Sequence, residues 1–212
     1  MQLYSYFRSS ASFRVRIALG LKGLAYDYVP VQIVQNEQFT EGFDTLAPAH
    51  LVPVLRDGDA VLTQSMAIIE YLDETHPEPP LLPGGALDRA RVRALAQDIA
   101  CEIHPLNNLR VLRYLVKDLG VSEDDKNRWY RHWIETGLAA VERQMVKSGA
   151  AGRYCYGDTP TLADCVLVPQ IFNARRLDCK TDHVPMVMSA FEACMRLEAF
   201  ERAQPASCPD AV

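Results

Sequence analysis

The chain changes character at residues 77–85, PEPPLLPGG, a stretch dense in proline and glycine. Before this stretch, short runs rich in valine, isoleucine and tyrosine alternate with segments of helical apolar spacing, whereas after it only helical spacing is found. Proline and glycine interrupt regular structure, so the stretch predicts a linker between two domains. We therefore expect domains at residues 1–82 and 87–212.

The predicted order of elements in the first domain is strand, helix, strand, helix, strand, strand, helix. The two strands before the last helix are joined by Asp57 and Gly58, a strong hairpin signal. A βαβ unit followed by a hairpin and a closing helix is the thioredoxin-like α/β arrangement. The predicted strands span residues 3–7, 26–34, 54–56 and 60–63, and the helices follow Ser10 and span 39–46 and 66–75.

The second domain is predicted to be entirely helical. Its helices are expected at residues 88–119, with a kink at Pro105, and at 126–145, 162–174 and 186–203. Thr161 followed three residues later by Asp164 predicts a capping box at the start of the third helix. We expect the last residues, 209–212, to be frayed.

Composition narrows the class of protein. The chain has 49% hydrophobic and 23% charged residues, which is typical of a soluble globular protein. A net charge of -5 argues against a general nucleic-acid binder. No signal peptide, membrane-length apolar run or metal-binding motif is found, and the six cysteines, all beyond residue 100, form no C-x-x-C pair. We therefore expect a cytoplasmic protein with reduced thiols that acts on small molecules.

Three short segments of the first domain are suited to hold a polar ligand. Ser9 and Ser10 lie at a strand-to-helix junction, where free amides, hydroxyls and the helix dipole attract an anion. Val52-Pro53 is compatible with a cis bond that leaves the Val52 backbone free to pair with an extended peptide. Ser65, preceded by Gln64, begins another helix and suits a carboxylate.

Cationic and polar side chains supply further candidates. Arg8 immediately precedes the two serines, and Arg176 follows Arg175 at the end of the capped third helix. His104 and Asn108 are four residues apart and would share one face of a continuous helix. Other side chains are assigned structural roles: Arg14 and Arg16 in ion pairs, and Trp129 and Trp133 in helix packing.

Five motifs together resemble the zeta class of glutathione transferases, of the maleylacetoacetate and maleylpyruvate isomerase type. They are SSASFRVRIALGLKG, LVPVL, QSMAIIEYLDETHP, LLP and GDTPTLADCVLVPQI, and the match covers essentially the whole chain. The resemblance implies a thioredoxin-like domain that binds glutathione and a helical domain that holds the second substrate. It also implies a homodimer.

The resemblance assigns roles to individual residues. It implies that Ser9 and Ser10 face the glutathione sulfur, and that Arg176 meets a carboxylate of a dicarboxylate substrate. Arg8 is a second candidate catalytic cation because of its own position, between the first strand and the serines. The remaining residues implied to bind glutathione are Ala11, Gln38, Val52, Pro53, Gln64, Ser65, His104, Asn108 and Arg110. On an ideal helix Arg110 would face away from His104, so either Pro105 redirects it or it serves a dimer partner.

This chain departs from the family pattern at two positions. Ala11 stands where the family has cysteine, and Phe13 where it has tryptophan. Phe13 is an apolar replacement that should still pack. Ala11 leaves the first domain without any thiol, so the nucleophile must come from glutathione and thiol–disulfide exchange by this domain is excluded.

Three functions are consistent with these residues. The first hypothesis is a glutathione-dependent cis–trans isomerase acting on maleylacetoacetate or maleylpyruvate. The second is a general glutathione transferase or dehalogenase of small halogenated acids, in which glutathione is consumed. The third is a non-catalytic glutathione-binding module. The serines and Gln64 disfavour the third, and the set of Arg8, His104 and Arg176 favours a dicarboxylate over an apolar electrophile.

Overall fold

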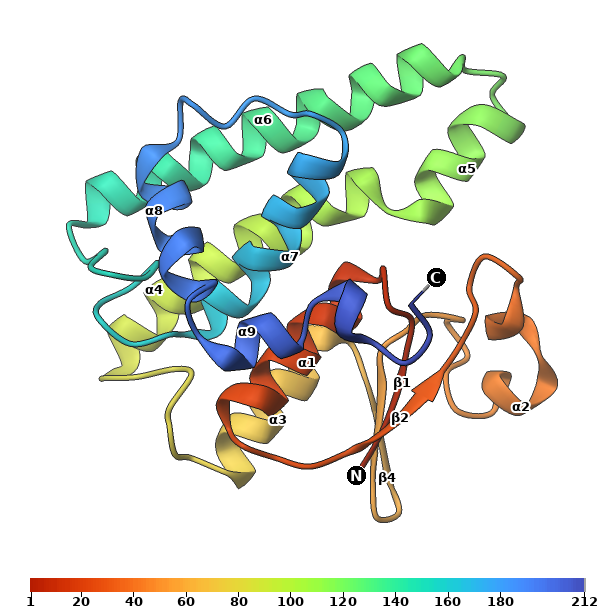
Figure 1. The fold of residues 1–212 in the computed structure, drawn as a ribbon, viewed down its shortest axis with the longest axis horizontal. Helices are drawn as coiled ribbons and strands as arrows, with labels where there is room; N and C mark the ends of the chain where they lie inside the picture. The colour runs from red at the N-terminus through yellow and green to blue at the C-terminus, as the bar shows by residue number, and fades with distance from the viewer. Residues whose placement is uncertain (212) are drawn as a thin grey trace. The chain divides into compact units, whose positions relative to one another are not determined.

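A computed structural model describes residues 1–211, which fall into two compact units (Figure 1). The first unit contains Met1–Leu81 together with residues 195–211, and the second is Leu82–Cys194. The first unit combines strands and helices and the second is built from helices, in agreement with the predicted fold class. Within residues 1–211, no helix has both the length and the apolar character needed to cross a bilayer.

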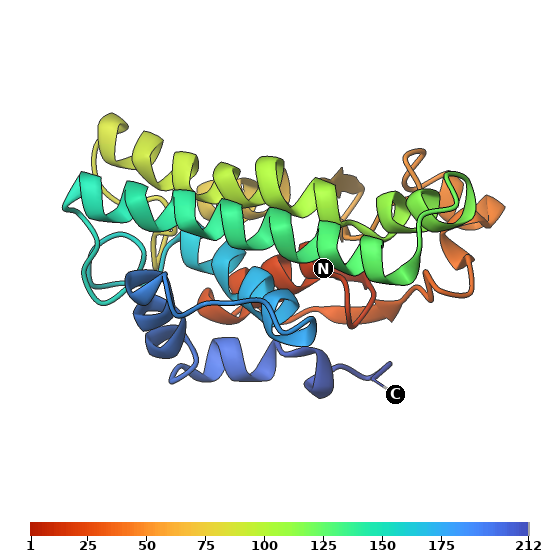
Figure 2. The same cartoon turned by 90° about the horizontal axis from the view of Figure 1, so that it is seen from above.

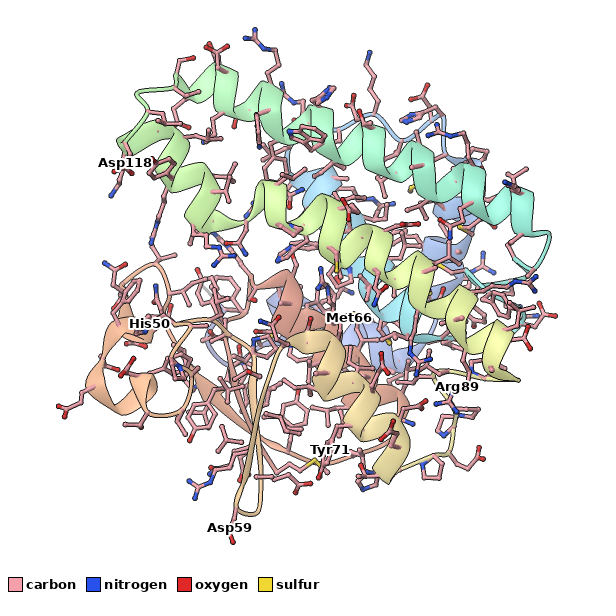
Figure 3. All side chains as sticks on the ribbon, turned by 180° about the vertical axis from the view of Figure 1, so that it is seen from behind. His50, Asp59, Met66, Tyr71, Arg89 and Asp118 are labelled. Carbon is pink, nitrogen blue, oxygen red and sulfur yellow. The ribbon has the colours of Figure 1, made fainter. Side chains whose placement is uncertain are left out.

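The first unit is built on a four-stranded mixed sheet with the strand order β2-β1-β3-β4. β1 pairs in parallel with β2 and antiparallel with β3, and β3 and β4 form the predicted hairpin. Gly58 in the hairpin turn has a φ of 57°, which glycine adopts without a steric penalty. Asp59 marks the hairpin tip in Figure 3. The strands are β1 (Gln2–Ser5), β2 (Asp27–Pro30), β3 (Val54–Asp57) and β4 (Ala60–Thr63).

Helices cover both faces of this sheet. Figure 1 shows α1 (Ser10–Leu21) and α3 (Ser65–Thr75) on one side of the strands and the short α2 (Glu41–Asp44) on the other. α1 is preceded by Ser9, its N-cap, as predicted. The predicted strand 26–34 is shorter than expected, because a turn begins after Val31 and leads to a 3-10 helix at Glu37–Phe39.

Residues 82–194, the second unit, contain five α-helices and a broken segment between α4 and α5. α6 is longer at both ends than predicted because Ser122 caps its start and Gly149, in the left-handed region, ends it. α7 begins with the predicted capping box. The α-helices are α4 (Ala86–Gln97), α5 (Leu109–Lys117), α6 (Glu123–Ser148), α7 (Leu162–Arg176) and α8 (Pro185–Cys194).

The prediction of one kinked helix over residues 88–119 is wrong. α4 passes into a π-helix (Asp98–Ile103) and a 3-10 helix (His104–Asn107), and Asn108 then takes an extended conformation before α5 begins. Pro105 lacks the amide that would continue the helical hydrogen-bond ladder, so the helix is interrupted, not merely bent. Figure 2 shows α6 lying alongside this segment. At Gly137 of α6 a Cβ atom would come within 2.3 Å of Ile103, so glycine permits this close approach.

The end of the chain also differs from the prediction. The expected helix at 186–203 is split by residues 195–197 into α8 and α9 (Glu198–Arg202), and residues 195–211 pack with the first unit. α9 lies against α1, where a Cβ atom at Gly20 would come within 3.2 Å of the Ala199 carbonyl. The expected fraying is wrong for residues 209–211, because Asp210 makes two hydrogen bonds to the first unit. Val212 lies outside the described residues.

A compact group of apolar side chains, here called the α2-side core, joins several parts of the first unit. It connects the end of β1, α2, the start of β3 and the C-terminal segment. All of its members are less than one-tenth exposed. They are Tyr6, Phe7, Val31, Phe43, Ala47, Val52, Val54 and Cys208.

Candidate functional site

The turn between β1 and α1 presents the two predicted serines. The Ser9 amide donates to the Tyr6 carbonyl at 2.9 Å, which closes a four-residue turn, and the Ser9 Oγ accepts from the Ser12 amide at 3.2 Å. As an acceptor in that bond, the Ser9 hydroxyl keeps its own hydrogen for another acceptor. Ser10 is the first residue of α1 and is buried. The junction therefore combines hydroxyls with the positive end of a helix dipole.

Arg8 and Ala11 flank these serines. Arg8 is exposed, and its guanidinium lies 4.9 Å from the centre of the Phe7 ring. A cation over an aromatic face gains an attraction of about 0.5–1 kcal/mol at an exposed site. Ala11 is half-buried in the first turn of α1. Arg8 thus places a positive charge beside the serine turn.

The Val52-Pro53 peptide bond is cis, an arrangement with which the sequence was compatible. The Val52 side chain is buried in the α2-side core, and β3 begins two residues later. Within residues 1–211, the backbone amide and carbonyl of Val52 make no hydrogen bond. A backbone donor and acceptor without partners are the groups with which an extended peptide ligand can pair.

Gln64 and Ser65 form the start of α3, next to Met66 in Figure 3. Gln64 has a φ of 69°, a left-handed conformation that a residue with a side chain adopts only when the surroundings impose it. Ser65 is 5% exposed, and its Oγ accepts a hydrogen bond from Arg14 Nη1 at 3.2 Å. This bond holds the start of α3 against α1, the helix that Ser9 caps.

The contact between Arg14 and Ser65 was not predicted, since the sequence suggested ion pairs for Arg14 and Arg16. Arg16 in fact donates to three uncharged oxygens, at Ser5, Phe7 and Ala203. Neither arrangement has a sequence signal, because the partners are distant along the chain.

Gln38 lies in the 3-10 helix before α2 and is 6% exposed. Its side-chain Oε1 is buried without a hydrogen-bond partner, and its backbone carbonyl lies 2.9 Å from the His50 Nδ1. His50 has a φ of 55° and is labelled in Figure 3. No sequence signal pointed to His50, which ties the Gln38 segment to the segment that leads into Val52. A buried amide oxygen without a donor is an available acceptor.

In the second unit, His104, Asn108 and Arg110 lie around the break before α5. Asn108 caps α5, and its Oδ1 accepts from the Arg110 amide at 3.1 Å. Its Nδ2 lies 3.4 Å from the His104 Nε2. The predicted proximity of His104 and Asn108 is present, but it arises from the helix break and not from a shared helix face. Because the helix is broken between His104 and Arg110, the positions of these two residues on an ideal helix do not apply.

Arg176 is the last residue of α7 and is exposed. Its Nη2 donates to the Tyr130 hydroxyl at 3.4 Å. Burial raises the pKa of Tyr130, and Arg176 opposes this rise. The neighbouring Arg175 instead places its guanidinium 4.4 Å from the centre of the Phe191 ring. Of the two arginines, Arg176 is the one anchored by a hydrogen bond to a buried side chain.

The two tryptophans of α6 have a packing role. The Trp129 indole donates to the Leu106 carbonyl at 2.7 Å, and the Trp129 and Trp133 rings are 5.6 Å apart in an edge-to-face arrangement.

Taken together, the first unit offers anion-favouring helix starts and the unpaired backbone of Val52, and the second unit offers Arg176 and the His104–Asn108 pair. Within residues 1–211 no group of three or more potential metal ligands is found.

Comparisons with known proteins agree with this chemistry. Residues 1–74 match the model of the glutathione S-transferase N-terminal domain, and residues 127–196 match that of the C-terminal domain. A maleylpyruvate isomerase from Ralstonia sp is 48% identical over 210 residues, covering 99% of both chains. A solved maleylpyruvate isomerase, described as a bacterial zeta-class glutathione S-transferase, superposes with a TM-score of 0.97 at 47% identity and full coverage of both chains. The maleylacetoacetate isomerase of Methylobacterium extorquens AM1, solved with bound malonate and glutathione, gives a TM-score of 0.96 at 38% identity, again over both full chains.

Proposed function

This chain belongs to the zeta class of glutathione transferases, and we propose that it is a glutathione-dependent cis–trans isomerase of maleyl keto-diacids. Maleylacetoacetate, which would give fumarylacetoacetate, and maleylpyruvate, which would give fumarylpyruvate, are the candidate substrates, and the reaction belongs to the catabolism of aromatic compounds. The observation that carries the proposal is the arrangement of the first unit. Two serine-started helices are joined by the Arg14–Ser65 bond and accompanied by the unpaired backbone of Val52.

The residues of the first unit fit glutathione by their donor and acceptor chemistry. The unpaired Val52 backbone, set by the cis bond to Pro53, suits the peptide frame of the cofactor. The Ser65 hydroxyl, which accepts from Arg14, can donate to the γ-glutamyl carboxylate beside Gln64. The buried Oε1 of Gln38 can accept an amide hydrogen. We propose these residues, with Ala11 at the start of α1, as the binding set in this unit.

We propose that Ser9 and Ser10 keep the cofactor sulfur ionised. A free thiol has a pKa of about 8.5, and hydroxyl donors at a helix N-terminus stabilise the thiolate relative to the thiol. When bound, glutathione would supply a thiolate for reversible addition to the cis double bond, which would make that bond single and so allow rotation about it. Since Ala11 replaces the family cysteine, this domain adds no thiol of its own.

We propose that cations hold the anionic substrate. Arg8 beside the serine turn and Arg176, held by Tyr130, would each pair with a carboxylate or with the charge that develops on the keto oxygen. His104, Asn108 and Arg110 are proposed as further glutathione contacts. A buried Tyr130 hydroxyl that remains protonated is a neutral acceptor, so it orients Arg176 without cancelling its charge.

We further propose a homodimer in the cytoplasm. Large apolar side chains that are more than half exposed, such as Phe39 and Leu87, are the kind of surface that subunit contacts cover. Six cysteines without a disulfide among residues 1–211 suit a reducing compartment that contains glutathione. Sedimentation analysis tests the dimer, and a monomer at micromolar concentration would contradict it.

An ultraviolet assay of each cis substrate, with and without glutathione, tests the function. We expect isomerisation only in the presence of glutathione, with the free thiol concentration unchanged after many turnovers. Stoichiometric loss of glutathione with a halogenated acid, and no isomerisation, would favour the transferase or dehalogenase function. Binding of glutathione without either reaction would favour a non-catalytic binding module. The ratio of kcat/KM for the two diacids identifies the preferred substrate.

A further inference from the structure

The turn that carries Ser9 is held in place from both sides of Phe7. The turn runs from Tyr6 to Ser9, and Phe7 is one of its two central residues. The Phe7 amide donates to Asp210 Oδ2 at 3.2 Å, and the Phe7 carbonyl accepts from Arg16 Nη2 at 3.1 Å. Both peptide planes that flank the Phe7 Cα are therefore fixed by side chains. A turn with its central peptides fixed has little freedom to change the direction in which the next residues point.

Asp210 is itself fixed by a second hydrogen bond. Its Oδ1 accepts from the Tyr28 hydroxyl at 2.6 Å, so its two carboxylate oxygens bind the turn after β1 and a side chain of β2. Burial, and next the hydrogen bond to Asp210, raise the pKa of Tyr28, so this hydroxyl stays a donor. The positive Arg16 interacts favourably with Asp210, which offsets the cost of placing a carboxylate here.

The chain that carries Asp210 is anchored on the same unit. Arg16 Nε donates to the Ala203 carbonyl at 3.0 Å, and Cys208 packs into the α2-side core with Phe7 and Val52. Arg16 thus binds both the serine turn and the C-terminal segment. The last residues of the chain consequently support two parts of the proposed glutathione site, the serine turn and the Val52 backbone.

We propose that the C-terminal segment, residues 203–211, positions the serine turn for thiol activation, and that Asp210 is its principal positioning residue. The inference rests on the proposed function, since it concerns the sulfur site of that function. Asp210 need not touch glutathione. It would act through the Phe7 amide, which sets where the Ser9 and Ser10 hydroxyls and the first amides of α1 point. Loss of this bond should weaken stabilisation of the thiolate more than binding of the tripeptide frame.

The test compares Asp210→Ala, Asp210→Asn and Tyr28→Phe with the matched control Asp27→Asn, an exposed carboxylate next to Tyr28. The pKa of the bound thiol is measured from thiolate ultraviolet absorbance as pH is varied. Affinity for S-methylglutathione, which has no ionisable thiol, reports binding of the frame alone. For Asp210→Ala we expect a higher bound-thiol pKa and a turnover at neutral pH lowered by about tenfold, the effect of one hydrogen bond of about 1.4 kcal/mol.

Turnover of Asp210→Ala should recover toward the wild-type value at alkaline pH, and S-methylglutathione affinity should change less than twofold. A purely structural role would lower the melting temperature without raising the thiol pKa, and that result would overturn the inference. Should Asp210→Ala fail to fold, Asp210→Asn and Tyr28→Phe, each of which removes a single bond, decide the question by the same readout. If the wild-type protein neither binds glutathione nor lowers its thiol pKa, the proposed function itself fails. An unchanged thiol pKa in the variants alone rejects only the role of Asp210.

Discussion

At the scale of the residue, Ser9 has two roles that substitutions can separate. Its oxygen caps α1 by accepting from the Ser12 amide, and its hydrogen is available to an anion. Ser9→Ala should lower stability by about 1 kcal/mol through loss of the cap. Ser9→Gly should cost only a few tenths, because glycine is a good N-cap residue. Both changes remove the hydroxyl, so both should lower turnover by about 10- to 100-fold, the range expected for a hydrogen bond to a charged group.

Ser10 supplies the comparison, since it is the first helical residue and not the cap. Ser10→Ala should leave the Ser9 cap of α1 in place, and whichever serine donates to the sulfur should show the larger fall in kcat. Chemical denaturation gives the free energy of unfolding of each variant, and steady-state kinetics on the same preparations gives its kcat. If neither serine variant changes the rate, backbone amides alone activate the thiol.

Arg176 and Arg175 form a natural pair for testing the substrate cation. Arg176→Ala should raise KM for the diacid by about tenfold or more, because a charge-assisted hydrogen bond contributes about 1.5–3 kcal/mol. Arg175→Ala is the matched control, as Arg175 stacks on Phe191 in the same last turn. Circular dichroism verifies folding. An Arg176 variant with a wild-type KM would remove this residue from the site.

At the scale of the element, the capping box of α7 is a test of helix stability in the second unit. Asp164 is fully buried and accepts hydrogen bonds from the Thr161 amide and hydroxyl, both at 2.8 Å, and from the Cys155 amide at 2.9 Å. Asp164→Ala leaves three buried donors without an acceptor. Each orphaned group costs about 1–3 kcal/mol, so we expect a loss of about 3 kcal/mol or more in the free energy of unfolding.

Denaturant unfolding measures this loss, and the exposed Asp182→Ala provides the control. Asp164→Asn should be intermediate, because an amide oxygen still accepts while the NH2 group does not. A loss below 1 kcal/mol for Asp164→Ala would mean that water or another side chain takes over the freed donors.

The elements that could be predicted from the sequence are those with a local cause. The Ser9 cap, the hairpin at Gly58 and the Thr161–Asp164 box each depend on residues a few positions apart. The sequence was likewise compatible with the cis Val52-Pro53 bond, because of the proline itself. Local chemistry of this kind leaves a signature that a short stretch of sequence contains.

The features that sequence reasoning missed depend on distant partners. Pro105 predicted a kink, but not that Asn108 would take an extended conformation and cap a separate helix. The Arg14–Ser65 bond joins residues 51 positions apart, and the Asp210–Phe7 bond joins residues 203 positions apart. Such contacts exist only once the chain has folded, and they support the candidate site without forming a motif.

At the scale of the whole molecule, ligand binding should stabilise the folded chain by mass action. A ligand at 100 times its Kd stabilises by about 2.7 kcal/mol, which for a chain of this length corresponds to roughly 5–10 °C in melting temperature. S-methylglutathione should produce most of this shift if the peptide frame supplies most of the affinity. The difference in melting-temperature shift between glutathione and S-methylglutathione then measures the contribution of the thiolate site alone.

The shift in melting temperature on glutathione binding also tests whether the second unit contributes to cofactor binding. Arg110 and Lys117 are exposed basic residues near opposite ends of α5. If Arg110 contacts glutathione, Arg110→Ala should reduce the thermal shift at a fixed glutathione concentration, while Lys117→Ala should not. A tenfold loss of affinity lowers the stabilisation by about 1.4 kcal/mol, or roughly 3–6 °C, which differential scanning calorimetry resolves. Equal shifts in the two variants would exclude the Arg110 side chain from cofactor recognition. In that case Arg110 would serve only through its amide, which already binds the Asn108 cap.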